Sequence, residues 1–170
     1  MTAARLSPTY PEELEITALD TAETFIVATA RLWAAPHRDP WQPHPDWRGG
    51  FRAAGVAADG AHAFDTLFWI VVAGGHRSLD IRCPRCPRLG GDEAWLLQLV
   101  SYAQAGRPDL TEIALGEWLP PGAGRAAVVH ASIYGHALMA AGLLVPAERR
   151  HPGTGHALET LHHGASHALH

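Results

Sequence analysis

The sequence predicts an all-α protein, with a single compact domain of five to six helices arranged as an orthogonal bundle. Apolar residues recur at helical spacing in several segments, and no segment shows the convincing period-two alternation that is typical of strands. Glycine and proline clusters separate these segments, as expected for helices joined by short turns. The chain has 170 residues, of which 47% are hydrophobic and 18% charged, so it is long enough and apolar enough to build one core.

Three regions are expected along the chain. Residues 1–10 are predicted to form a mobile N-terminal arm, residues 11–145 the helical domain, and residues 146–170 a tail rich in histidine and glycine. The tail loses the apolar pattern and holds six of the twelve histidines, so we expect it to be partly disordered. Such a tail can bind transition metals through neutral imidazoles, or its composition can carry no function at all.

The first helix is expected from Pro11 to about Ala35. Proline in the first turn followed by two acids is typical of a helix N-terminus, and Pro36 is expected to stop the helix because the residue before a proline avoids helical geometry. A short helix is expected from Trp47 to about Val56, with Asp46 as its N-cap.

The next helix is expected over residues 61–73, after a chain break at Asp59-Gly60. It is apolar nearly all round, since Trp69, Ile70 and Val72 add to its core stripe, so we expect it at the centre of the fold. The predicted core stripe consists of Phe64, Leu67, Phe68 and Val71.

Three further helices complete the predicted bundle. One starts near Asp92, with Gly91 or Asp92 as cap, and ends at Gly106; the next runs over residues 108–119, and the last over residues 123–141. The inward positions predicted for the first of these are Leu96, Leu99, Val100 and Ala103. Those predicted for the last are Val129, Ile133, Ala137 and Ala140.

Composition excludes several kinds of chemistry. All 13 basic residues are arginine, so no side chain can form a Schiff base and no lysine-containing phosphate-binding loop can exist. The formal net charge of −4 argues against a surface built for nucleic acid.

The most informative motif is the pair of cysteines in Cys83-Pro84-Arg85-Cys86-Pro87. These are the only cysteines of the chain. Two thiols at this spacing can bind one zinc or iron ion, which needs further ligands. We expect His76 as a third ligand, with Asp80, His62 or a tail histidine as the fourth. Alternatively, two chains supply one cysteine pair each at a symmetric interface.

The same cysteines are open to two other interpretations. Arg82, Arg85 and Arg88 surround them, and positive charge favours the thiolate, as a redox pair would need. Thioredoxin-like sites, however, belong to α/β folds, and no such pattern surrounds this motif. The third interpretation is structural, because flanking prolines make a turn rigid without any metal.

A proline-rich loop carries two tryptophans, Trp41 and Trp47, on either side of His44. Exposed in a stiff loop, these residues would make a partner-binding surface. The alternative, which we favour, is that both indoles fold back as a lid over the bundle, because isolated apolar loop residues usually bury themselves.

Together these features predict a non-enzymatic helical protein that acts through binding or regulation, with a structural or sensory metal site at Cys83 and Cys86. The alternatives are a thiol redox protein and an assembly subunit that docks through the Trp41–Trp47 loop. The expected partner is a protein, including a second copy of this chain, and neither nucleic acid nor a membrane. The N-terminus lacks a signal-peptide pattern and the longest apolar run is too short to span a bilayer, so a cytoplasmic location is expected.

Overall fold

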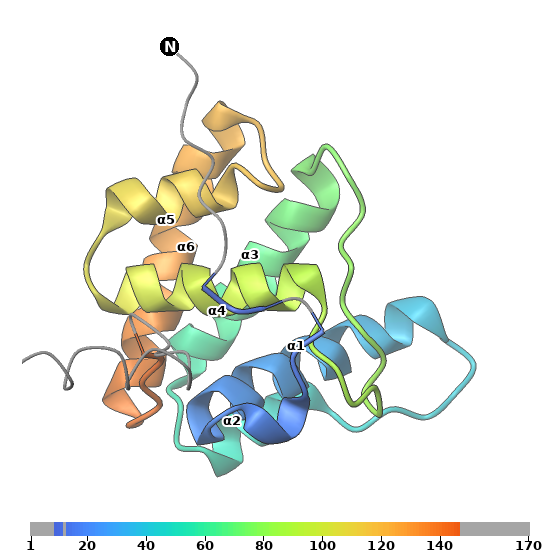
Figure 1. Cartoon of the computed structure of the whole chain (residues 1–170). Coiled ribbons are helices and arrows are strands. Elements are labelled where there is room, and N and C mark those ends of the chain that lie inside the picture. Colours follow the sequence, from blue (N-terminus) through green and yellow to red (C-terminus); the bar gives the residue numbers. More distant parts are fainter. Residues whose placement is uncertain (1–8, 12, 147–170) are drawn as a thin grey trace, which may run out of the picture.

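Six α-helices and one 3-10 helix make up the described part of the computed structural model, which comprises residues 9–11 and 13–146. No strand occurs in these residues, although Glu15 and Arg88 form one isolated antiparallel bridge. The prediction of an all-α fold is therefore confirmed (Figure 1). The elements are η1 Ile16–Ala18, α1 Thr21–Arg38, α2 Trp47–Ala53, α3 Ala58–Gly74, α4 Gly91–Gln104, α5 Pro108–Leu115 and α6 Pro121–Ala140.

The centre of the fold is α4, in which every residue from Asp92 to Ser101 is buried. Its neighbours α5 and α6 also pack against each other, and Figure 1 shows α4 crossing α6 with α5 alongside. The most extensive contact between two helices joins α3 to α6, while α1 packs against α4 and α2. The predicted central helix was α3, but its Trp69 and Val72 are 48% and 52% exposed, so that prediction is wrong. Its predicted core stripe is confirmed, since all four of those residues are buried.

Small residues allow α6 to approach its neighbours closely. A Cβ atom added at Gly60 of α3 would lie 2.3 Å from the Cβ of Ala137, and one added at Gly135 would lie 2.8 Å from the Cβ of Ala103 on α4. Gly74 at the other end of α3 lies near Ala123, so α3 and α6 run antiparallel.

The buried face of α6 accordingly differs from the one predicted. Of the four predicted positions, Ala137 packs against the core, whereas Val129 and Ile133 are 58% and 39% exposed and Ala140 is also exposed. The core face carries smaller residues together with Tyr134 and Leu138. Helical spacing alone favoured the larger aliphatic residues. Close backbone packing selects small residues at such a contact, because larger ones would hold the helices apart.

Replacing Gly60 by alanine is expected to lower the free energy of unfolding by about 1–3 kcal/mol, because the added methyl group overpacks the contact with Ala137. Gly124→Ala is the matched control. No atom lies within 4 Å of a Cβ added there, and alanine is the better helix former, so this change should stabilise by about 0.5–1 kcal/mol. Urea unfolding of both variants measures the two effects. If both substitutions change the free energy of unfolding in the same direction, the close contact between Gly60 and Ala137 is contradicted.

The start of α1 lies ten residues after the predicted one. Asp20 is its N-cap: the Asp20 carboxylate accepts from the Glu23 N–H and the Glu23 carboxylate accepts from the Asp20 N–H, both at 2.8 Å. The preceding segment instead pairs with the chain before α4, since Ile16 N–H donates to Pro87 O at 2.8 Å and Leu89 N–H donates to Leu14 O at 2.7 Å. Tertiary pairing and a complete capping box therefore outweigh the signal of Pro11.

Two other predicted breaks are also wrong. Pro36 lies inside α1, which continues to Arg38, because proline removes only one hydrogen bond near the helix end while Asp39 N–H still donates to Ala35 O at 3.0 Å. Asp59-Gly60 lies in the first turn of α3, where an acid suits the helix dipole. The cap of α2 is confirmed, since the Asp46 carboxylate accepts from Arg48 N–H at 3.0 Å.

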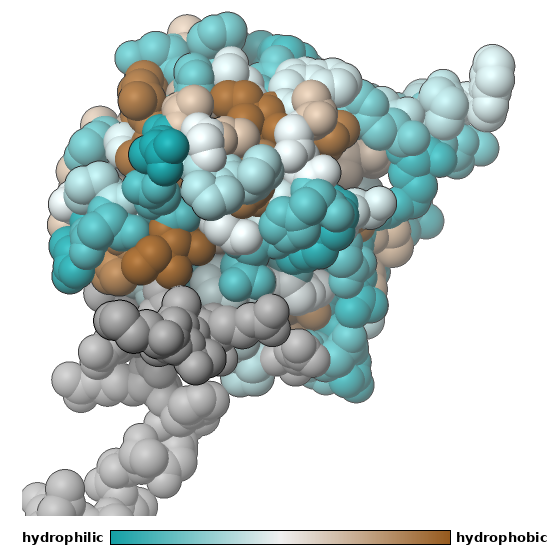
Figure 2. All heavy atoms as spheres, turned by 90° about the horizontal axis from the view of Figure 1, so that it is seen from above, coloured by the Kyte–Doolittle hydropathy of each residue, from teal (hydrophilic) through white to brown (hydrophobic). Residues whose placement is uncertain are grey.

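Apolar side chains on the face shown in Figure 2 gather in separate patches divided by hydrophilic atoms. No helix among the described residues is long and apolar enough to cross a membrane. Thr9 and Tyr10, which we placed in the N-terminal arm, belong to the fold: Tyr10 is buried and Thr9 N–H donates to the side chain of Gln98 at 3.1 Å. The predictions for residues 1–8 and for the tail from residue 147 fall outside the described residues.

Candidate thiol site at the Cys83–Cys86 turn

Both cysteines lie in one closed turn of the α3–α4 connection, residues 75–90. The N–H of Cys86 donates to the carbonyl oxygen of Cys83 at 3.0 Å. A turn closed in this way brings the Cα atoms of its first and fourth residues within about 7 Å, which suits two bonds to one metal ion or a disulfide. Cys83 is exposed and Cys86 half-buried, and no disulfide joins them.

Arg31 of α1 holds the turn from beneath. Its guanidinium donates to the carbonyl oxygens of Cys86 and Arg88 at 2.6 and 2.7 Å. The same guanidinium forms a two-pronged ion pair with Glu93 of α4, with both nitrogen–oxygen distances 2.8 Å. The side chains of Arg31 and Glu93 are only 3% and 0% exposed, so the whole arrangement is buried beneath the turn.

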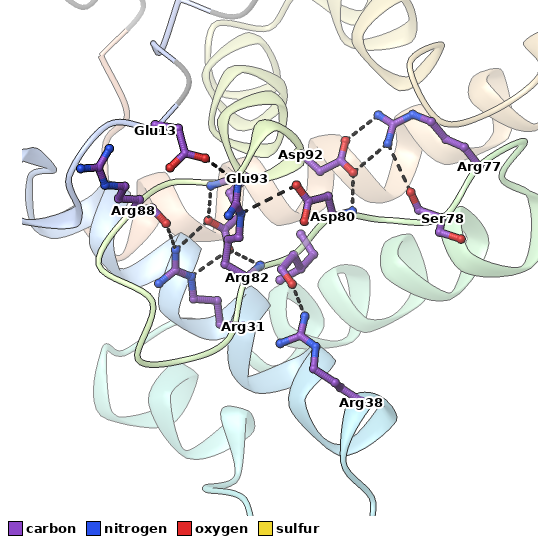
Figure 3. A network of polar contacts seen from close by, with 12 residues as sticks. Glu13, Arg31, Arg38, Arg77, Ser78, Asp80, Arg82, Arg88, Asp92 and Glu93 are labelled. Carbon is purple, nitrogen blue, oxygen red and sulfur yellow. Dashed lines mark hydrogen bonds and ion pairs between the residues drawn. The ribbon is translucent and has the colours of Figure 1, made fainter.

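Glu93 fixes the chain on both sides of the turn (Figure 3). Its carboxylate accepts from the N–H of Arg82 at 2.9 Å, before the turn, and from the N–H of Gly90 at 2.8 Å, after it. The carboxylate also lies at the N-terminus of α4, where the helix dipole favours negative charge. One buried side chain thus sets the positions of both ends of the cysteine turn.

Asp92, the neighbour of Glu93, anchors the first half of the connection. Its carboxylate accepts from Arg77 at 2.5 and 2.8 Å, from the N–H of Asp80 at 2.6 Å and from the indole N–H of Trp118 at 2.8 Å. Burial acts to raise the pKa of Asp92. The hydrogen bonds and the charge of Arg77 outweigh burial and hold that pKa below its ordinary value.

The arginines around the turn differ in their surroundings. Arg82 forms an ion pair with Glu13 at 2.7 Å and lies 3.8 Å from the carboxylate of Asp80. Its charge is therefore shared with two acids. Arg85 and Arg88 are exposed.

His76 does not join the two cysteines. No three His, Cys, Asp or Glu side chains within residues 9–11 and 13–146 lie together in a group that could hold a metal ion. The backbone N–H of His76 donates to Trp118 O at 2.9 Å, and its side chain lines a groove with Trp33 and Trp69. The tail histidines proposed as further ligands lie outside the described residues.

The proline-rich loop behaves differently at its two tryptophans. Trp47 is buried, packs against Phe64 with a centroid distance of 5.2 Å, and carries the Arg48 guanidinium 4.1 Å above its ring. Trp41 is 92% exposed, so the expected lid is formed by Trp47 alone. His44 Nε2 lies 2.7 Å from the carbonyl oxygen of Asp39, which braces the loop.

Sequence reasoning missed the residues that hold the turn. It treated Asp92 only as a possible helix cap, and it gave Glu93 and Arg31 no role at the turn. The available signal was a single arginine among apolar residues in the middle of α1, where a charge is buried only with a partner.

The fold and the turn together define an all-α protein in which a turn with one exposed and one half-buried thiol is held by a network of buried charges. Comparison with family models, with curated proteins and with solved structures found no match to this chain.

Proposed function

We propose that this chain is a non-enzymatic regulatory protein in which the Cys83–Cys86 turn senses a metal ion that binds thiolates. Zinc is the expected ion, and iron is the alternative. The observation that carries this proposal is the closed turn that bears both cysteines, with its backbone fixed by Arg31 and Glu93. Such support would reduce the ordering cost of metal binding, because the backbone that carries the two cysteines is already fixed.

A second copy of the chain is the proposed source of the remaining ligands. Zinc in structural sites takes four ligands, and the turn supplies two. The described part of the chain offers no third ligand beside them. Two exposed turns related by a two-fold axis would give four thiolates around one ion, so metal binding and dimerisation would be coupled.

A chelator test examines this proposal on the full chain. The melting temperature should fall by at least about 2–4 °C when a zinc chelator is added, since loss of about 1 kcal/mol of binding energy shifts the melting temperature of a domain of this size by that amount. Cys83→Ser should melt at the lower temperature with or without chelator. Arg85→Gln, on the same turn, is the control and should respond like the wild type. If the wild type melts at the same temperature with and without the chelator, the proposal is wrong.

The second candidate function is thiol redox chemistry at the same turn. The turn closure that suits a metal ion also gives a Cα separation compatible with a Cys83–Cys86 disulfide. Titration of the thiols before and after mild oxidation distinguishes the two functions. A reversible loss of two thiols per chain without dimerisation favours the redox function, and unchanged thiols exclude it.

A further inference from the structure

A groove lies between the C-terminal halves of α1 and α3 and the connection that follows α3. Its volume is ≈ 600 Å³, within the range of sites that hold small molecules. Trp33 and His37 come from α1, Trp69 from α3, and His76 and Arg77 from the connection. The groove is separate from the cysteine turn, although the same connection carries both.

Three rings form one wall of the groove. Trp69 meets Trp33 and His37 edge to face, at centroid distances of 5.5 and 5.2 Å, and Trp33 and His37 lie 4.8 Å apart. Trp33 is buried and its indole N–H donates to Asp65 at 2.7 Å, so the wall has a fixed base. Trp69 is 48% exposed and offers its open surface to a flat partner.

The charge of the groove is positive, in contrast to the chain as a whole. Its titratable lining residues are His37, Arg38, His76 and Arg77, with no acid among the residues that line it. The formal net charge of the chain is −4, so these groups form a local concentration of basic side chains. Arg77 is neutralised by Asp92 beneath it.

Arg38 is therefore the main source of unbalanced positive charge in the groove. Its guanidinium donates to the carbonyl oxygen of Ile81, which holds it at the edge of the groove and leaves further N–H groups for an anion (Figure 3). A guanidinium in this position suits a planar carboxylate or a phosphate.

We propose that this groove binds a small planar aromatic anion, with its ring against Trp69 and its anionic group at Arg38 and His76. Aromatic carboxylates and nucleoside monophosphates share this chemistry, a flat ring that bears an acidic group. The rings supply contact area and the basic groups supply orientation, as in small-molecule sites where a few polar groups fix the pose.

Calorimetric titration of the full chain with 2-naphthoate and with adenosine monophosphate tests this site. At least one probe should bind with a Kd of about 1 mM or tighter, and the tighter one identifies the anionic group. Neutral 2-naphthalenemethanol should bind at least about tenfold more weakly than 2-naphthoate, because it lacks the charge that Arg38 recognises. The proposal is wrong if neither anionic probe binds at about 10 mM, tenfold above the expected Kd. It is also wrong if 2-naphthalenemethanol binds as tightly as 2-naphthoate.

Matched variants locate the binding. Trp69→Ala and Arg38→Gln should each weaken binding at least about tenfold, while Trp41→Ala and Arg52→Gln, exposed residues outside the groove, should bind as the wild type does. Circular dichroism checks that each variant is folded. Cys83→Ser should also bind normally, so failure of the metal proposal leaves this result unchanged. Equal losses in Trp69→Ala and Trp41→Ala would show that the probe does not bind in the groove.

Discussion

Glu93→Gln is expected to lower the free energy of unfolding by about 3–5 kcal/mol, the largest effect of any single change considered for this chain. The substitution keeps the size of the side chain but removes its charge. Arg31 would then remain buried with no opposite charge, since its side chain is only 3% exposed. The amide NH₂ of glutamine would also take the place of one carboxylate oxygen, so it would face an N–H group of Arg31 together with the N–H of either Arg82 or Gly90.

Urea unfolding at neutral pH measures the loss of stability in Glu93→Gln, and a variant of an exposed ion pair serves as the control. Arg107 pairs with Asp109 at 2.7 Å, with side chains 53% and 58% exposed, and Arg107→Gln should leave the free energy of unfolding almost unchanged. Hydrogen exchange adds a local readout, because the amides of Arg82 and Gly90 should lose protection in Glu93→Gln. Similar stability changes in the two variants would contradict the anchoring role of Glu93.

Asp92→Asn is expected to lower the free energy of unfolding by about 2–3 kcal/mol at neutral pH, because it removes the ionised acceptor from Arg77 and from two further donors. The pKa of Asp92 is lowered in the folded state. Its contribution is therefore complete above the unfolded pKa of about 4 and is lost as pH falls through the lower folded value.

The difference between the wild type and Asp92→Asn should consequently shrink as the medium becomes acidic. Urea unfolding at neutral pH and at several values below about pH 4 tests this, because a protonated Asp92 resembles asparagine in charge. A difference that stays constant across this range would mean that the ionised carboxylate contributes no stability.

Local patterns in the sequence were enough to predict much of the secondary structure. The core stripe of α3 and the Asp46 cap of α2 both depend on residues within a few positions of each other, so periodicity and capping rules find them. The predicted start at Pro11 failed because Asp20 and Glu23 form a complete capping box and the earlier segment pairs with residues 87–89.

Contacts between distant segments were beyond what the sequence could predict. The α6 face depends on Gly60, which lies 77 residues before the Ala137 it contacts. Arg31 and Glu93 are 62 residues apart, and neither one alone indicates a support for the cysteines. Trp33 lies in α1 and Trp69 in α3, and only the fold brings them together as one wall of a groove.

Metal content of the full, untagged chain by elemental mass spectrometry tests the proposed function most directly. The Cys83→Ser, Cys86→Ser double variant serves as the reference, so any metal held by other residues cancels in the difference. A site shared between two chains predicts about half an equivalent more zinc or iron per chain in the wild type, together with a dimer that dissociates in the variant. Equal metal content in the two proteins would contradict a metal-sensing role for the Cys83–Cys86 turn.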